Sequence, residues 1–331
     1  MLSAGENFFS RLKRCTSNMV LSIADLLYGY QLSAGPIVRI NPREVHVNDP
    51  MFYDEIYSSS TRVRDKDPCF VPTFALPLCL AATVSHKDHR FRRSLLNIFF
   101  SKRSVSELSP ACEKFIQRLM LRFEESYQEK KAIQLSDAFS ALSSDIITYY
   151  CFGNSWNFLE EKTFCSDIRT AVNEATALVH MNRFIPWIIW LPYVVPLKVM
   201  FWLQPGTAVL FKVAKAIFDQ SMEAMQKTNS TASTGVPKTA CKTGRTIFDR
   251  LTDPNLPPYQ RTLHHLQDEA TELLTAGTEA TGETLARAAY YLAKDKEILY
   301  QLRAELKRVM PIPTSTAIWQ DLEQLPFLVF T

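Results

Sequence analysis

An acid and an alcohol lie two residues apart in an unusual stretch of the sequence, residues 274–282, which reads LTAGTEATG. Glu279 and Thr281 have side chains that can hold a proton and pass it to a ligand bound nearby. We therefore take Glu279 and Thr281 as candidate catalytic residues, and their helix has to place them beside that ligand.

The same stretch contains two glycines, Gly277 and Gly282, inside a pattern that predicts a helix. A glycine in a helix interior costs about 1 kcal/mol relative to alanine, so each glycine requires a compensating contact. One interpretation is close packing against a neighbouring helix. The other is that Ala276 and Gly277 leave room for a flat ligand to lie against the helix. Both interpretations remain open on these residues alone.

A second candidate site consists of His89 and Arg93, which lie four residues apart in a predicted helix, 86–100. One helical turn separates them, so both side chains can reach the same anionic group. Arginine suits a carboxylate because its planar guanidinium donates two parallel hydrogen bonds. The alternative is a solvated basic face, since other basic residues surround the pair: His86, Lys87, Arg90 and Arg92.

Composition limits the classes of function. The chain has 331 residues, 47% of them hydrophobic, and a formal net charge of +3, which is too small to indicate a nucleic-acid partner. The seven cysteines form no CxxC pair and no zinc-ligand spacing, so we expect reduced thiols, a reducing compartment and no metal site of that kind. They are Cys15, Cys69, Cys79, Cys112, Cys151, Cys165 and Cys241.

The elements that must position these residues are mostly helical. A stripe of apolar residues predicts a long central helix over 261–293, about 50 Å in length, followed by another helix that Asp295 caps. Three- and four-residue apolar spacing predicts further helices over 86–100, 104–130, 136–150, 160–179 and 206–227. We expect a β-hairpin within 29–50, a short helix over 51–61, an irregular segment over 68–77 and a flexible loop over 228–245. The predicted fold class is mainly α, with a small β-hairpin and a long central helix.

Several motifs resemble those of fungal cytochrome P-450 monooxygenases of secondary metabolism. The run from Ala276 to Glu279 resembles their oxygen-activating Ala-Gly-Thr-Glu-Thr-Thr signature. Four other runs also resemble the family: 35–50, Lys66-Asp67-Pro68, 89–93 followed by 99–103, and 322–326. The resemblance covers residues 35–331, as a partial cytochrome P-450 domain, and leaves 1–34 as a divergent N-terminal segment. It implies the N-terminal part of the cytochrome P-450 fold.

The resemblance implies a haem cofactor and roles for the candidate residues. His89 and Arg93 would bind a haem propionate, Ala276 and Gly277 would lie against the haem, and Glu279 would act in proton delivery. It also implies a lipophilic substrate of terpenoid or polyketide type, O2, electrons from NADPH–cytochrome P-450 reductase, and the cytoplasmic face of the endoplasmic reticulum membrane.

Two departures from the family pattern affect these expectations. Ala280 stands where the family has the proton-relay alcohol, and Thr281 lies about 100° further around the helix. Thr281 or Thr278 could take its place together with a water, but their directions differ, so we expect coupled oxygen activation to be lost. No Glu-x-x-Arg motif follows Leu325, and none of the seven cysteines fits the ligand loop. We expect a truncated, inactive form; the alternative is a non-enzymatic helical ligand- or partner-binding protein derived from the same fold.

Membrane contact is expected to be peripheral. Charged residues interrupt 1–34, so we expect no N-terminal anchor there. The apolar stretch from Phe184 to Leu203 approaches spanning length, but three prolines and Lys198 interrupt it. This stretch therefore predicts a segment that either touches a membrane surface or lines the cofactor pocket.

Overall fold

The structure is a computed structural model that describes residues 36–42, 44–57, 62–177, 195–196, 198–199, 206–234, 246–312 and 315–330. The contacts divide the chain into two units. The first comprises Met1–Pro77, Ala81–Arg90 and Ala171–Ala208, and the second comprises Leu78–Leu80, Phe91–Thr170 and Val209–Thr331. The expected segment 1–34, the stretch 235–245 and most of 184–203 lie outside the described residues.

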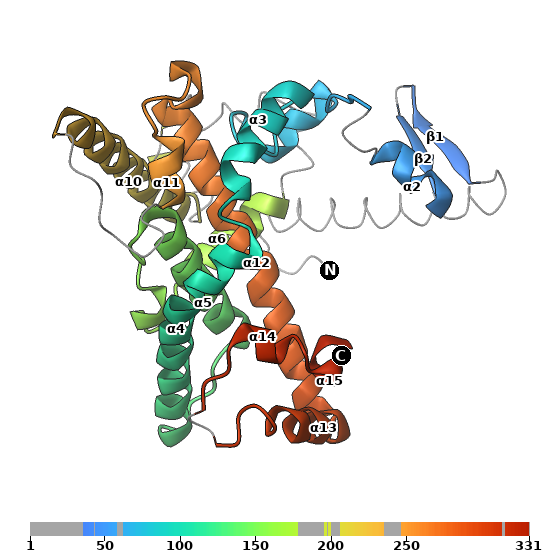
Figure 1. Cartoon of the computed structure of the whole chain (residues 1–331), viewed down its shortest axis with the longest axis vertical. Coiled ribbons are helices and arrows are strands. Elements are labelled where there is room, and N and C mark those ends of the chain that lie inside the picture. The colour runs from blue at the N-terminus through green and yellow to red at the C-terminus, as the bar shows by residue number, and fades with distance from the viewer. Residues whose placement is uncertain are drawn as a thin grey trace, which may run out of the picture. The chain divides into compact units, whose positions relative to one another are not determined.

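The hairpin of the first unit is confirmed. Strand β1 (Ile37–Asn41) pairs antiparallel with β2 (Glu44–Val47), with Ile37 opposite Val47 (Figure 1). The short helix that we expected next is a 3-10 turn, η1 (Pro50–Phe52), followed by α2 (Tyr53–Ile56). The segment predicted to be irregular contains a 3-10 helix, η2 (Pro68–Phe74). Its prolines exclude an α-helix, but Pro68 begins the 3-10 helix because the first residues of a helix need no donor.

Helices make up most of the remaining described chain, as predicted. In order they are α3 (His86–Asn97), α4 (Lys102–Gln128), α5 (Leu135–Phe152), η3 (Phe158–Glu160), α6 (Ser166–Ala177), α10 (Gly206–Thr234), α11 (Ile247–Leu251), η5 (Pro258–Gln260), α12 (Leu263–Lys294), α13 (Lys296–Leu306), α14 (Trp319–Leu322) and α15 (Pro326–Phe330). The predicted long central helix is α12, whose 32 residues span about 48 Å. No described helix is long and apolar enough to cross a lipid bilayer.

Side-chain caps fix several helix starts. The Thr262 hydroxyl accepts a hydrogen bond from His265 N at the start of α12. Asp295 caps α13 as predicted, because its carboxylate accepts from the backbone N–H groups of Glu297 and Ile298. α6 begins later than expected, at Ser166, because Phe164 and Cys165 adopt left-handed backbone conformations with φ of 52° and 54°.

One loop boundary was wrong. We expected a flexible loop from residue 228, but α10 continues as a helix through Thr234. Serine, threonine and asparagine are weaker helix formers than alanine, yet none of them breaks a helix as proline does, so the helix persists through Thr234.

The interior of the second unit is organised around the pairing of α5 with α12 (Figure 1). Helix α5 is rich in small buried residues, including Ala138, Ser140 and Ala141, which allow a close approach. Two apolar clusters flank this pair. One joins Leu80 and residues of α3 to α11 and α12, and the other packs α4 and α5 against η3.

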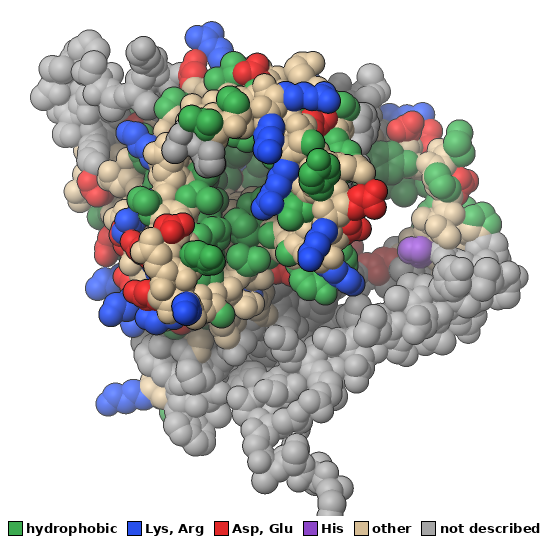
Figure 2. Space-filling model, turned by 90° about the horizontal axis from the view of Figure 1, so that it is seen from below, with side chains coloured by type: hydrophobic (Ala, Val, Ile, Leu, Met, Phe, Trp, Pro, Cys, Tyr) green, Lys and Arg blue, Asp and Glu red, His purple; other side chains and the backbone are tan. Residues whose placement is uncertain are grey.

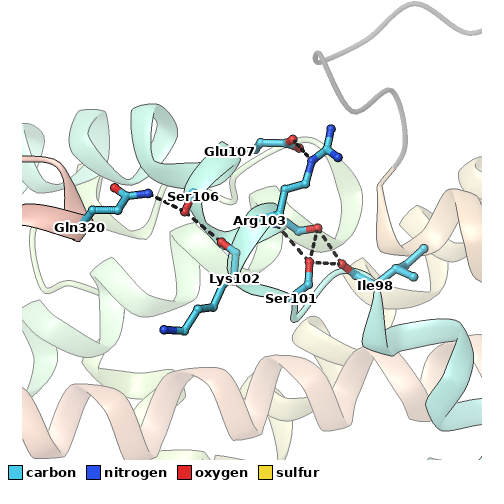
Figure 3. A network of polar contacts seen from close by, with 8 residues as sticks. Ile98, Ser101, Lys102, Arg103, Ser106, Glu107 and Gln320 are labelled. Atoms are coloured by element: carbon cyan, nitrogen blue, oxygen red, sulfur yellow. Dashed lines mark hydrogen bonds and ion pairs between the residues drawn. The ribbon is translucent and has the colours of Figure 1, made fainter. Parts of the chain in front are cut away.

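The N-terminus of α4 contacts α14 through exposed polar groups. Ser101 caps α4 and its hydroxyl donates to Ile98 O, while Lys102 Nζ lies 2.9 Å from Glu323 Oε1. Gln320 Nε2 donates to Ser106 Oγ at 3.3 Å, as Figure 3 shows. Hydrophobic side chains also remain at the surface, where Figure 2 shows them among lysines and arginines on one face.

Candidate functional site

The two glycines of α12 both face α5. A Cβ atom added to Gly277 would lie 3.1 Å from Ile147 Cγ1, and one added to Gly282 would lie 2.8 Å from Ser140 N. The helix-packing interpretation is therefore confirmed for both positions. Because Gly277 opens toward α5, a flat ligand on the other side of α12 would meet Ala276 rather than Gly277.

The side of α12 opposite α5 carries Ala276 and Ala280, both exposed, and Glu279, which is half-buried. At 100° per residue, Ala280 lies about 40° and Glu279 about 60° around the helix from Ala276, so the three share one face. Thr281 is also exposed, but it lies about 140° from Ala276 and does not share that face. The predicted pair of Glu279 and Thr281 is therefore divided between two faces.

Thr278, the other hydroxyl that could have replaced the alcohol missing at Ala280, is directed toward α5. Thr278 Oγ1 lies 2.9 Å from Ser144 Oγ of α5, within hydrogen-bonding distance. Thr278 thus contributes to the α5–α12 contact. Between residues 276 and 280 of the described chain, Glu279 is the one acid or alcohol on the same helix face as Ala276.

On α3, His89 is half-buried and Arg93 is exposed. Arg93 forms no ion pair with the described residues, which leaves its guanidinium able to receive an external carboxylate. The boundary between the two units passes between these residues, at Arg90 and Phe91. A shared anionic group for His89 and Arg93 therefore stays a prediction.

Arg92 was assigned to a possible solvated face, and this was wrong. Its side chain is only 11% exposed, and Nη2 lies 2.8 Å from Glu269 Oε2, whose side chain is 5% exposed. Glu269 also accepts from the backbone N–H of Leu80 at 3.1 Å, and Arg92 Nη1 donates to the carbonyl of Cys79 at 3.2 Å. This buried pair links α3, α12 and residues 78–80.

Burial dominates the titration of Glu269. Desolvation raises the pKa of Glu269 to about 7, and the positive charge of Arg92 opposes this shift without cancelling it. Burial also raises the pKa of Asp268, whose carboxylate accepts from Leu78 N at 2.8 Å. On the preceding turn, burial and the charge of Arg92 lower the pKa of His265. A small pocket beside the pair is lined by Arg92, Gln260, His265 and leucines of α3, α11 and α12.

A second buried carboxylate organises the connection after α5. Asp145 is 1% exposed and accepts hydrogen bonds from the backbone N–H groups of Phe158 and Leu159, each at 2.9 Å, and from Ser155 Oγ at 2.6 Å. Desolvation raises the pKa of Asp145 despite these bonds. The carboxylate holds η3 against α5, the helix that Gly277 and Gly282 contact.

Burial disfavours the thiolate form of three described cysteines, Cys112, Cys151 and Cys165. Cys79 and Cys151 are buried, and burial raises the pKa of Cys112 and Cys151 above the ordinary thiol value. Burial and nearby carboxylates raise the pKa of Cys165 to about 12. No cluster of three or more histidine, cysteine or acidic side chains that could hold a metal ion occurs among the described residues.

The sequence profile of the family described as cytochrome P450 matches residues 22–330. The chain belongs to the cytochrome P450 family. The match begins before residue 35, the boundary that the motifs suggested, and extends through the helical region that carries both candidate sites. The family implies a haem cofactor.

The relatives are fungal enzymes. The chain is 37% identical to a cytochrome P450 monooxygenase of Penicillium crustosum, claJ, over 89% of the chain and 66% of that protein. It is also 37% identical to a conidiogenone synthase of Penicillium rubens, over 89% of the chain and 57% of that protein, and 34% identical to a cytochrome P450 monooxygenase of Fusarium sporotrichioides, over 55% of that protein. The chain thus spans less than two thirds of the length of these relatives.

The fold agrees with the sequence match. The chain superposes on the crystal structure of a cytochrome P450, CYP102L1, with a TM-score of 0.61. The match covers 99% of this chain and 68% of the CYP102L1 chain. At 15% sequence identity this likeness establishes the fold alone. The predicted N-terminal part of the cytochrome P450 fold is therefore confirmed.

The residues present fit part of a haem site. Arg93 offers an exposed guanidinium of the kind that binds a carboxylate in a two-pronged arrangement, and the exposed residues Ala276 and Ala280 present only methyl groups, one turn apart on α12. Arg92 and Glu269 were missed as supporting residues. The signal was Glu269 itself, an acid between Leu266, Ala270 and Leu273 in an otherwise apolar stripe.

Proposed function

We propose that this chain carries the haem-carboxylate and distal-helix elements of a monooxygenase that oxidises a lipophilic secondary metabolite of terpenoid or polyketide type. The supporting observation is the fungal family match across 89% of the chain together with the exposed guanidinium of Arg93. Electrons would come from NADPH–cytochrome P450 reductase at the cytoplasmic face of the endoplasmic reticulum, with peripheral membrane contact through 184–203.

Each candidate residue has a separate task in this proposal. Arg93 would donate hydrogen bonds to a haem propionate, with His89 one turn away on α3. Ala276 would allow the flat macrocycle to approach α12, while Gly277 keeps α12 close to α5. Glu279 would hold a proton on the face of Ala276. When bound with a thiolate on its iron, haem supplies the activation of O2.

We propose further that the 331 residues do not complete this chemistry. Ala280 carries no proton, and Thr281 lies about 140° away from Ala276, so no alcohol accompanies Glu279 on that face. None of the seven cysteines fits the loop that supplies the sulfur ligand of the iron in the family. The expected behaviour is haem binding without monooxygenase turnover.

Titration of the purified chain with haem, followed by absorbance, tests the binding proposal. Arg93→Met should weaken haem binding at least about tenfold, since two charge-assisted hydrogen bonds are worth more than 1.4 kcal/mol. Arg90→Met, three residues earlier on the same helix and also exposed, is the matched control and should bind as the wild type does. Equal affinities for Arg93→Met and wild type would exclude the assigned role.

The non-enzymatic alternative predicts a different result in these binding experiments. A helical ligand-binding protein derived from this fold would bind lipophilic metabolites with or without haem. If terpenoid or polyketide ligands bind the haem-free chain and Arg93→Met leaves haem binding unchanged, the alternative is favoured over the monooxygenase-derived site.

A further inference from the structure

The carboxylate of Glu269 makes two contacts that meet at one oxygen. Glu269 Oε2 accepts from Arg92 Nη2 at 2.8 Å and from the backbone N–H of Leu80 at 3.1 Å. Arg92 in turn donates to the carbonyl of Cys79. These groups belong to the same unit of the structure, so α12, the second half of α3 and residues 78–80 are joined in one closed set of bonds.

The adjacent acid extends this set. Asp268 Oδ2 accepts from the backbone N–H of Leu78 at 2.8 Å, so two successive acids of α12 bind the N–H groups of residues 78 and 80. Cys79 and Leu80 are buried, and Leu80 packs in the same apolar cluster as Leu96 and Leu266. The segment is therefore held by directional bonds on one side and by apolar packing on the other.

We propose that Glu269 and Arg92 are positioning residues that fix α3 on α12 and thereby set the place of the Arg93 guanidinium. This inference rests on the proposed function, because Arg93 matters only if it binds a haem carboxylate. Arg92 precedes Arg93 directly, so a shift or rotation of α3 that breaks the Arg92–Glu269 contact also moves Arg93. Binding groups lose affinity when the residues that orient them are released.

A buried ion pair of this kind is not required for stability alone. Apolar residues of similar volume in place of a buried ion pair often leave a protein equally or more stable. The double variant Arg92→Met Glu269→Leu should therefore remain folded while it loses the bonds to Cys79 and Leu80. It separates a positioning role from a purely structural one.

The first test measures haem affinity and stability on the full chain. The double variant should stay folded and bind haem at least about tenfold more weakly than the wild type, in keeping with the usual effect of removing an orienting partner. Its unfolding free energy should fall by no more than about 3 kcal/mol, because the buried N–H of Leu80 loses its acceptor. Glu269→Gln, which keeps the shape of the side chain, should lose affinity in the same direction. Arg90→Met should change neither quantity. Haem binding by the double variant as tight as that of the wild type would overturn the inference and leave the proposed function standing.

Amide hydrogen exchange provides a readout that does not depend on haem. The N–H of Leu80 and those of the last two turns of α3 should exchange faster in the double variant, whereas those of α13 should not change. If the wild-type chain fails to bind haem, the proposed function falls. Exchange that then stays unchanged at Leu80 and in α3 would also overturn the positioning role.

Discussion

The substitution Gly282→Ala tests the close contact between α5 and α12 at Ser140, which positions the candidate site. An alanine Cβ at this position would lie 2.8 Å from Ser140 N and 2.9 Å from Ser140 Cα, and ordinary contact begins at 3.4 Å. Helices α5 and α12 would have to separate by about half an ångström, because the obstacle is backbone and cannot rotate away. Overpacking of this kind costs about 1–3 kcal/mol.

The same substitution also removes a helix-breaking residue, which opposes the clash. Replacing an interior glycine with alanine stabilises a helix by about 1 kcal/mol, so we expect Gly282→Ala to destabilise the chain by up to about 2 kcal/mol overall. Gly277→Ala serves as the comparison. There the nearest atoms are Ile147 Cγ1 at 3.1 Å and Cβ at 3.3 Å, which must give by only a few tenths of an ångström, so the loss should be smaller than that of Gly282→Ala.

Urea unfolding followed by circular dichroism measures both variants. Gly282→Ala should lower the unfolding midpoint relative to both wild type and Gly277→Ala, and Ala280→Gly calibrates the propensity contribution at an exposed position of the same helix. A Gly282→Ala protein that is more stable than the wild type would refute the close α5–α12 contact.

Three further outcomes follow from the polar groups. The pKa of Glu269 rises from 4.5 to about 7 on folding, so the neutral acid is favoured in the folded chain. The contribution of Glu269 to the unfolding free energy, up to about 3 kcal/mol, is present below pH 4.5 and is lost as the pH rises to 7. Glu269→Gln should therefore flatten the pH dependence of the unfolding free energy between pH 4.5 and 7, even though the charged groups of Arg92, Asp268, Glu272 and His265 lie nearby. Identical slopes for the variant and the wild type would contradict this. Asp145→Ala should cost about 3 kcal/mol in urea unfolding, because it leaves two buried N–H groups without an acceptor, and a loss below about 1 kcal/mol would argue against that assignment. Lys102→Met should change the unfolding free energy by less than about 1 kcal/mol, since the Lys102 side chain is 80% exposed, and a larger loss would show that the exposed contacts of α14 carry real stability.

The regular elements could be predicted because their signals are local. The spacing of apolar residues in 261–293 fixes the extent of α12 within two residues at each end, and Asp295 marks the next helix through its own cap. The end of α10 could not be predicted in the same way. Ser, Thr and Asn neither favour nor forbid a helix strongly, so composition alone did not decide residues 228–234.

The site was only partly predictable because its decisive contacts join distant parts of the sequence. Arg92 and Glu269 lie 177 positions apart in the sequence. The sequence of α3 does not distinguish Arg92, whose side chain is largely buried, from its exposed basic neighbours. Gly277 matched both a packing and a ligand interpretation. The distinction depends on where Ile147 lies, and the sequence of α12 does not contain that information.

The ferrous–carbon monoxide spectrum of the haem-loaded chain tests most directly whether these residues receive haem without supplying its sulfur ligand. We expect a bound-haem spectrum that lacks the red-shifted Soret band of a thiolate complex. A thiolate-type band that disappears when one of the seven cysteines is replaced would contradict the account.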